Sequence, residues 1–152
     1  MNGDRDKNEG NVVNKLRIML VDDSSNLRHV IKRYIASGEF GMELIFFEAG
    51  DGAVAMQTIQ EQDVIGEPID VIFLDWMMPR VTGYEFLMQI KSMEPFKERP
   101  FIVMLTAETY AEQINAIQKY NVDAYVTKPF TQEDLVSTLM KIVDGKGLKR
   151  AV

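Results

Sequence analysis

Five short apolar runs alternate with amphipathic segments from Lys15 onward, and this alternation constrains the fold more than any other feature of the chain. The runs are LRIMLV (16–21), ELIFFEA (43–49), IDVIFL (69–74), FIVMLT (101–106) and AYVT (124–127). Three of them are nearly continuous in apolar residues, which is typical of parallel strands that are covered on both faces. Strict alternation of strands and helices predicts an α/β fold with a doubly wound, five-stranded parallel sheet and five helices.

The periodicity of the intervening segments predicts the helices. The first helix has apolar residues at steps of three and four, namely Leu27, Val30, Ile31, Tyr34 and Ile35. The second helix is expected over about 51–62 and the third over about 83–93.

Two further helices complete the alternation. The fourth is marked by Tyr110, Ile114, Ile117 and Tyr120. Asn121 would be its left-handed cap. The fifth begins at Thr131, which forms a Thr-x-x-Asp capping signature with Asp134. The apolar stripe of this helix consists of Leu135, Leu139, Ile142 and Val143.

The length, net charge and composition of the chain exclude several classes of protein. The 152 residues fit one domain, expected over 15–144, with a flexible tail at 1–14 and a second tail at 145–152. A net charge of −6 argues against a DNA-binding surface, because phosphate backbones attract clustered Lys and Arg. The absence of Cys excludes disulfides and thiolate metal sites. No apolar run of about 18 residues and no signal-peptide pattern is found, so we expect a soluble cytoplasmic protein without membrane insertion.

Polar residues stand at the ends of four expected strands. The first strand ends in Asp22 and Asp23, and the third ends in Asp75. The fourth ends in Thr106, and Lys128 follows the fifth. Ligands of doubly wound sheets bind at the carboxyl ends of the strands, near the point where the strand order reverses. We therefore expect three carboxylates, a hydroxyl and an ammonium group to meet at one edge of the sheet.

Each of these residues also has an ordinary structural explanation. Asp22 and Asp23 could cap a helix, and Asp75 could stabilise a turn. Thr106 could be a β-branched strand residue, and Lys128 a solvated surface residue. Their joint placement is what favours a site. Three neighbouring carboxylates repel one another and need a cation, and oxygen ligands without His or Cys favour Mg²⁺. Mg²⁺, an ammonium group and a hydroxyl suit phosphoryl transfer to a carboxylate nucleophile.

At this point the sequence resembles the receiver domains of two-component response regulators, over about residues 15–144. The resemblance depends on VDDS, LDWMMPRVTG, LTAE and YVTKPF, which occur in the right order on the right elements. The DW-x-MP and TAE motifs are similar to those of CheY-like, single-domain receivers. The resemblance implies a flavodoxin-like sheet with the strand order 2-1-3-4-5, as in CheY.

The resemblance also implies which residues accept the phosphoryl group and which bind the metal. Asp75 would be the phosphoacceptor and also a ligand of Mg²⁺. Asp23 would bind Mg²⁺ directly, whereas Asp22 would act mainly through water. The backbone carbonyl of Met77 would be a further metal ligand.

Other positions would complete the switch. Lys128 would pair with Asp75 before the reaction and with the phosphoryl group after it. Thr106 would hydrogen-bond to the phosphoryl group, and the small Ala107 would leave room for its entry. Tyr125 would be the aromatic switch whose ring turns inward when Thr106 shifts. The bond between Lys128 and Pro129 would be a cis peptide, a form that is accessible mainly to X-Pro bonds.

The implied function is a stand-alone signalling switch. It would not be an enzyme, apart from self-phosphorylation by small phosphodonors and self-dephosphorylation. A histidine kinase or a phosphotransfer protein would supply the phosphoryl group, which adds nearly two negative charges. The face made by helix four, strand five and helix five, including Tyr125 and Tyr110, would then bind a downstream protein target. A role in chemotaxis is suggested only by the CheY-like motifs.

Three positions need separate comment. Asp51 and Asp75 are further apart than is usual in the family, and we expect the extra length in a surface loop at EQDVIGEP (61–68). Met77 stands over the phosphoryl group, where CheY has a polar residue, which leaves the dephosphorylation rate open; its thioether could instead fill a gap. His29 lies off the apolar face of its helix and is expected to be an exposed residue without a catalytic role.

Two other classes of function share parts of this pattern. A metal-dependent phosphatase working through an aspartyl-phosphate often carries Asp-x-Asp after the first strand, whereas Asp22 and Asp23 are adjacent. A flavin-binding domain of the same architecture would need open backbone amides and hydroxyls after that strand, where this chain is acidic. The receiver therefore remains the leading hypothesis.

Overall fold

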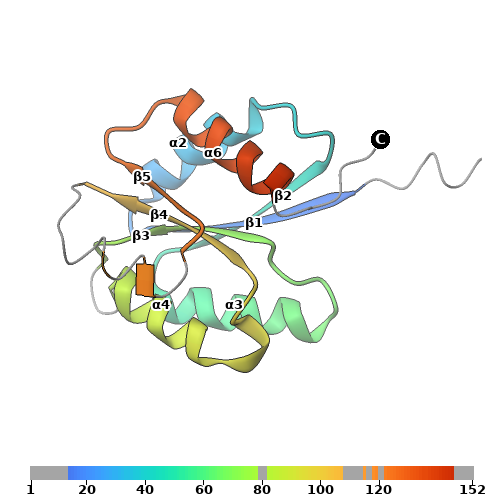
Figure 1. Ribbon diagram of the computed structural model, residues 1–152, viewed down its shortest axis with the longest axis vertical. Coiled ribbons are helices and arrows are strands. Elements are labelled where there is room, and N and C mark those ends of the chain that lie inside the picture. Colours follow the sequence, from blue (N-terminus) through green and yellow to red (C-terminus); the bar gives the residue numbers. More distant parts are fainter. Residues whose placement is uncertain (1–13, 79–81, 108–114, 116–117, 120–121, 146–152) are drawn as a thin grey trace, which may run out of the picture.

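The five apolar runs form one parallel sheet. The computed structural model describes residues 14–78, 82–107, 115, 118–119 and 122–145. Its strands are β1 (Lys15–Val21), β2 (Glu43–Ala49), β3 (Val71–Asp75), β4 (Phe101–Thr106) and β5 (Ala124–Thr127). They lie in the order β2-β1-β3-β4-β5, and each neighbouring pair is parallel (Figure 1). The predicted fold class and strand order are thus confirmed.

Helices cover both faces of the sheet. On one face lie α2 (Ser25–Ala36) and α6 (Gln132–Gly145), and on the other lie α3 (Gly52–Val64) and α4 (Gly83–Ser92). A short 3-10 helix, η1 (Glu94–Phe96), follows α4. The residues that predict a fourth helix, Tyr110, Ile114, Ile117, Tyr120 and Asn121, lie outside the described part of the chain. None of the described helices is both long and apolar enough to cross a lipid bilayer.

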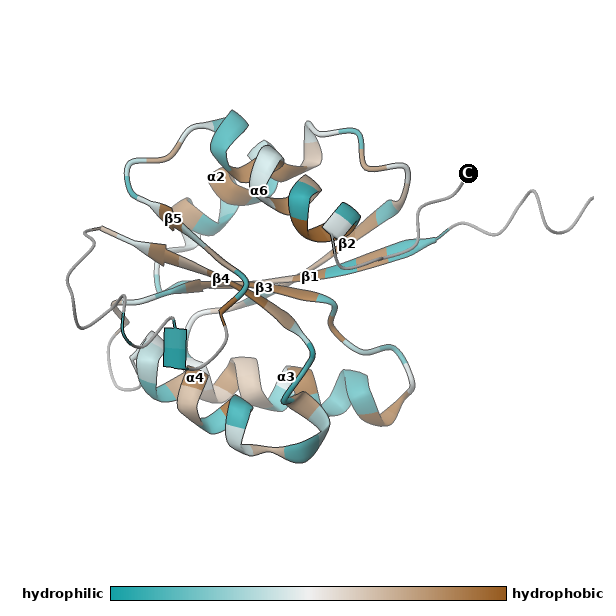
Figure 2. Ribbon diagram, in the orientation of Figure 1, coloured by the Kyte–Doolittle hydropathy of each residue, from teal (hydrophilic) through white to brown (hydrophobic). Residues whose placement is uncertain are grey.

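Two apolar cores fill the space between the sheet and its helices (Figure 2). Successive residues of β3 belong to different cores, because strand side chains alternate between the two faces. Phe73 packs with the core under α2 and α6, whereas Ile72 and Leu74 pack with the core over α3 and α4. Burial on both faces is the reason why this strand is almost continuously apolar in sequence.

Side-chain caps mark the start of two helices, and the cap at Thr131 is the one that the sequence predicts. Ser24 is the N-cap of α2, and its hydroxyl accepts a hydrogen bond from the Leu27 N–H at 3.2 Å. The capping signature before α6 is complete in both directions. The Thr131 N–H donates to the Asp134 carboxylate at 2.8 Å, and the Asp134 N–H donates to the Thr131 hydroxyl at 3.1 Å. These caps fix the entry of two helices that pack beside β1 and β5.

The extra length before β3 is only partly a loop. Contrary to expectation, α3 continues to Val64, so half of the EQDVIGEP segment is helical. The turn that follows the helix contains Gly66, which has a φ angle of 78°. The Gly66 N–H donates to the Asp63 carbonyl at 3.1 Å and the Glu67 N–H to the Gln62 carbonyl at 2.9 Å. This is the Schellman pattern, in which a left-handed glycine satisfies the last helical carbonyls.

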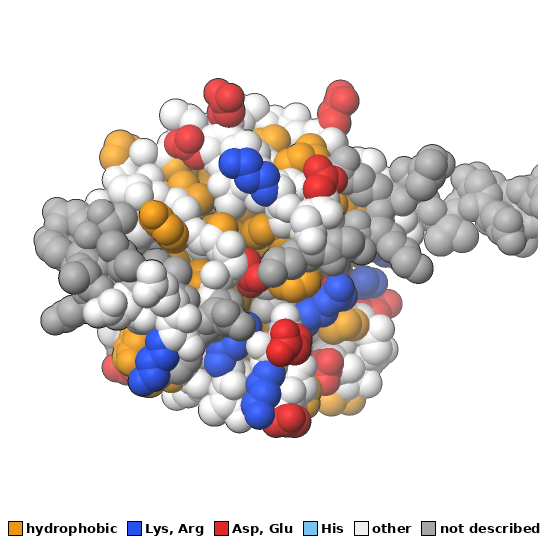
Figure 3. Space-filling view, in the orientation of Figure 1, with side chains coloured by type: hydrophobic (Ala, Val, Ile, Leu, Met, Phe, Trp, Pro, Cys, Tyr) orange, Lys and Arg blue, Asp and Glu red, His pale blue; other side chains and the backbone are white. Residues whose placement is uncertain are grey.

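The edge strand β5 leaves part of its outer side open. Tyr125 is 50% exposed, and Figure 3 shows hydrophobic side chains at the surface in the region of β5. A groove beside this strand is lined by Tyr125 together with Thr138 and Lys141 of α6. Half of the Tyr125 surface is therefore accessible to solvent in this structure.

Candidate functional site

The strand ends meet as the sequence predicts. β1 and β3 are neighbours, and Val21 pairs with Leu74. The next residues along these two strands, Asp22 and Asp75, therefore stand side by side. Asp22, Asp23 and Asp75 each offer a carboxylate oxygen, and these oxygens lie within 4.8 Å of one another. Three negative charges are thus gathered at the carboxyl edge of the sheet.

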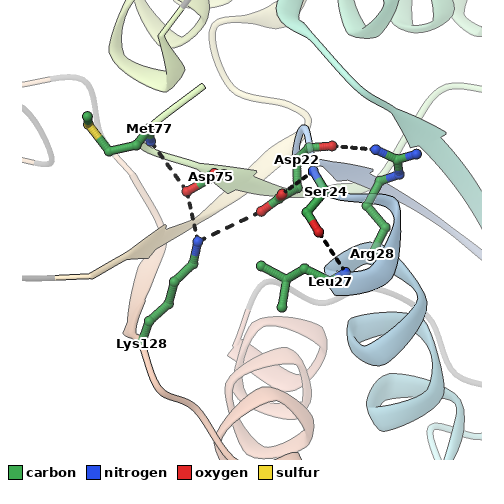
Figure 4. A network of polar contacts seen from close by, with 7 residues as sticks. All are labelled: Asp22, Ser24, Leu27, Arg28, Asp75, Met77 and Lys128. Carbon is green, nitrogen blue, oxygen red and sulfur yellow. Dashed lines mark hydrogen bonds and ion pairs between the residues drawn. The ribbon is translucent and has the colours of Figure 1, made fainter. Parts of the chain in front are cut away.

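Lys128 reaches this acidic cluster from the segment after β5. Its Nζ atom lies 3.0 Å from Asp75 Oδ1 and 3.8 Å from Asp22 Oδ2 (Figure 4). The Lys128 N–H donates to the Thr106 carbonyl at 2.7 Å, which ties this segment to the end of β4. The peptide bond between Lys128 and Pro129 is cis, as predicted. Among the described residues, one ammonium group therefore pairs with two of the three carboxylates, and the cluster keeps an excess of negative charge.

The two adjacent aspartates have different environments. Asp22 is only 2% exposed, whereas Asp23 is exposed to solvent. Burial raises the pKa of the Asp22 carboxyl from 3.8 to about 6; the Ser24 N–H opposes this shift and the Asp75 charge adds to it. Asp22 Oδ2 is buried and accepts no hydrogen bond from the described residues. A buried carboxylate oxygen without a donor, beside two other carboxylates, fits a hard divalent cation.

Asp75 is held by the chain that follows it. The Met77 N–H donates to Asp75 Oδ1 at 3.3 Å. The start of α4 then packs directly on the Asp75 backbone, because a Cβ atom at Gly83 would lie 2.2 Å from the Asp75 carbonyl oxygen. Only glycine allows this approach. Thr82 caps α4 by accepting a hydrogen bond from the Glu85 N–H at 3.2 Å.

The other predicted residues belong to β4, β5 and the segments that follow β3 and β4. Thr106 ends β4 and is 1% exposed, and Ala107 beside it is exposed. Met77 is 68% exposed, so its side chain is not a core filler. Tyr125 is on β5 and pairs in register with Met104, two residues before Thr106. His29 is exposed on α2 and lies outside the network of Figure 4.

Arg28 and its partner Glu48 have no counterpart in the sequence predictions. Arg28 Nη1 donates to the Asp22 carbonyl oxygen, and Arg28 Nε lies 3.1 Å from Glu48 Oε1. The available signal was weak: Arg28 is one helical turn after the N-cap Ser24, which places it near the acidic loop. Its pairing with Glu48, 20 residues away, could not be read from local spacing.

The chain is similar in sequence and fold to known proteins. The family model for the response regulator receiver domain matches residues 18–140. Chemotaxis protein CheY-3 of Vibrio cholerae is 33% identical over 134 residues, which cover 88% of this chain and 96% of that protein. Chemotaxis protein CheY of Pseudomonas aeruginosa is 32% identical over 129 residues, covering 85% and 97%. A solved structure of Vibrio cholerae CheY4 superposes with a TM-score of 0.71 at 29% identity, covering 84% of this chain and 98% of that one.

The family match spans most of the chain, and the order of the strands and the acidic edge of the sheet agree with it. The chain therefore belongs to the response regulator receiver domain family, the signalling switches of two-component systems.

Proposed function

We propose that this protein is a CheY-like response regulator whose Asp75 accepts a phosphoryl group from a histidine kinase or a phosphotransfer protein. The observation that carries the proposal is the ion pair between Lys128 Nζ and Asp75 Oδ1, at 3.0 Å, beside the carboxylates of Asp22 and Asp23. Asp75 is 5% exposed, so it is an acceptor in a confined site and not a freely solvated side chain.

The acidic cluster would hold the Mg²⁺ that the reaction needs. Asp23, Asp75 and the backbone carbonyl of Met77 would bind the ion directly, and Asp22 would bind it through water. The excess of negative charge supports this assignment, as does the buried Asp22 Oδ2, which accepts no hydrogen bond from the described residues. When bound, Mg²⁺ would neutralise charge on the oxygens of the phosphoryl group.

The side chains of the protein perform the transfer. A carboxylate oxygen of Asp75 attacks phosphorus and forms a new P–O bond, while the bond to the donor breaks and its electron pair leaves with the donor. During the transfer, the Lys128 ammonium group would change its partner from the Asp75 carboxylate to the phosphoryl oxygens. Its positive charge would then stabilise the negative charge of the transition state. The Thr106 hydroxyl then donates a hydrogen bond to the phosphoryl group. Ala107 limits steric hindrance at the entrance.

The modified Asp75 would change the surface that binds the target. The added group is nearly dianionic, and its bond to Thr106 favours one position of the end of β4. That shift would let the exposed ring of Tyr125 turn inward. A protein target that binds the face of β5, α6 and the segment between β4 and β5 would distinguish the two states. A switch of this kind requires that the phosphoryl group make different contacts in the two states.

The proposal is tested by incubating the protein with a small phosphodonor and Mg²⁺. We expect a mass increase of one phosphoryl group that is lost on acid or base treatment, as acyl phosphates are. The Asp75→Asn variant should show no increase, because its amide is not a nucleophile. An equal increase in that variant would place the reaction elsewhere. Steady hydrolysis of phosphomonoesters by the purified protein would instead favour a metal-dependent phosphatase.

The coupling between Thr106 and Tyr125 has a separate test. With 3-fluorotyrosine in place of the five tyrosines, the Tyr125 fluorine resonance, assigned with Tyr125→Phe, should shift on phosphorylation. The Thr106→Val variant keeps the shape of the side chain but lacks the hydroxyl. We expect it to become phosphorylated without the Tyr125 shift. The same shift in wild type and variant would contradict the proposed coupling.

A further inference from the structure

The peptide bond that joins Asp22 to Asp23 is held from the side opposite to Lys128 (Figure 4). The Asp22 N–H donates to the Ala49 carbonyl at 3.1 Å, at the end of β2. The Asp22 carbonyl oxygen accepts from Arg28 Nη1. The Ser24 N–H donates to Asp22 Oδ1 at 2.8 Å. Every polar group of Asp22 except Oδ2, which faces the cluster, is therefore fixed by a hydrogen bond.

Arg28 is itself fixed on three sides. Its Nε atom lies 3.1 Å from Glu48 Oε1 on β2, and its backbone N–H donates to the Ser24 carbonyl at 3.0 Å. Its side chain is only 16% exposed. The guanidinium thus links two parts of the fold, the acidic loop and the end of β2, from a residue whose backbone lies in the first turn of α2.

We infer that Arg28, oriented by Glu48, is a positioning residue that fixes the Asp22–Asp23 peptide and thereby sets the affinity of the site for Mg²⁺; this rests on the proposed function. Neither residue contacts the cluster of carboxylate oxygens. Mutual repulsion of the three carboxylates would push the loop outward, and the bond to the Asp22 carbonyl opposes that movement. A guanidinium can serve two acceptors at fixed angles, whereas a lysine ammonium on a flexible stem cannot reproduce this geometry.

The positive charge of Arg28 should weaken Mg²⁺ binding, whereas its positioning of the loop should strengthen Mg²⁺ binding. A cation close to the site repels Mg²⁺, so an influence through charge alone predicts tighter Mg²⁺ binding when Arg28 is neutralised. An influence through position predicts weaker binding. It also predicts weaker binding when Arg28 is replaced by lysine, which leaves the charge unchanged. The sign of the effect therefore separates the two explanations.

The experiment is a Mg²⁺ titration followed by tryptophan fluorescence. Trp76 is the only tryptophan of the chain and is adjacent to Asp75, so its emission reports on this site. Arg28→Lys and Arg28→Gln should each raise the Kd for Mg²⁺ about tenfold, as loss of a residue that orients metal ligands does. The matched control is Arg33→Gln, which removes the same charge from an exposed position of α2 and should leave the Kd unchanged.

A second readout needs no metal. In the Mg²⁺-free protein, the Ser24 amide, which donates to Asp22 Oδ1, should exchange with solvent faster in Arg28→Lys than in wild type. Glu48→Ala keeps Arg28 but removes its carboxylate partner, and should also weaken Mg²⁺ binding and speed this exchange. If either Arg28 variant fails to fold, this Glu48 variant decides the matter.

An unchanged Kd and unchanged Ser24 exchange in Arg28→Lys would overturn the inference, as would tighter binding in Arg28→Gln. A wild-type protein that binds no Mg²⁺ would contradict the proposed function instead. In that case the exchange measurement would still decide whether Arg28 fixes the loop.

Discussion

Replacing Lys128 with methionine should slow phosphorylation of Asp75 by a small phosphodonor about 100-fold at saturating Mg²⁺. The ammonium group lies 3.0 Å from Asp75 Oδ1, which places it where charge develops during the transfer. Methionine retains much of the aliphatic stem and loses only the charge and its hydrogen bonds. The initial rate of mass gain, measured with the Mg²⁺ concentration varied, separates a slower reaction from weaker metal binding.

The Lys128 variant should keep its fold. The side chain is 26% exposed, and methionine retains most of its buried aliphatic stem. The matched control is Lys15→Met, which removes an exposed lysine at the opposite end of the sheet and should not change the rate. A Lys128→Met protein that is phosphorylated as fast as Lys15→Met would show that the ammonium group does not take part in the transfer.

The second large effect concerns stability. We expect Asp22→Asn to stabilise the Mg²⁺-free protein at pH 7 by on the order of 2 kcal/mol, since the wild-type protein must bury a charge there. Burial raises the Asp22 pKa from 3.8 to about 6, so the folded state binds this proton more tightly than the unfolded state does. The contribution of Asp22 to stability is therefore lost as the pH rises from about 4 to about 6. Asparagine does not titrate, so the advantage of the variant should shrink as the pH falls from 7 towards 4.

Urea unfolding in the presence of a chelator, at several pH values, measures this difference. Asp63→Asn is the matched control, because Asp63 is an exposed carboxylate on α3 and its replacement should have little effect. With Mg²⁺ added, the order should reverse, because wild type gains more from the ion than Asp22→Asn does. An Asp22→Asn protein that is less stable than wild type at pH 7 without metal would contradict this account of the site.

Much of the fold could be predicted because the relevant signals are local. A parallel strand with two buried faces is apolar throughout, and an amphipathic helix repeats with a period of 3.6 residues. The ends of the strands and helices were predicted less accurately. β3 begins at Val71 rather than at Ile69, and α3 runs past Gln62 to the turn at Gly66. The continuation of a helix depends on its last hydrogen bonds, which the apolar pattern does not encode.

The membership of the acidic site was also predictable, because neighbouring strand ends meet at one edge of the sheet. The difference between Asp22 and Asp23 was not predictable to the same degree. Both are carboxylates in the same short loop, yet one is almost fully buried and the other is exposed. Likewise, the contact of Arg28 with the Asp22 carbonyl depends on the path of a long side chain and on Glu48, a distant residue. Such long-range side-chain geometry requires the folded structure.

The most direct test of the central claim is to locate the phosphoryl group within the chain. After reaction with a small phosphodonor and Mg²⁺, reduction with borohydride converts an aspartyl-phosphate to homoserine, which tandem mass spectrometry identifies in the digested protein. Our account predicts homoserine at position 75 alone, and none when Mg²⁺ is removed by a chelator. Homoserine at position 22 or 23 instead, or none at position 75 in protein that has gained the mass of a phosphoryl group, would contradict it.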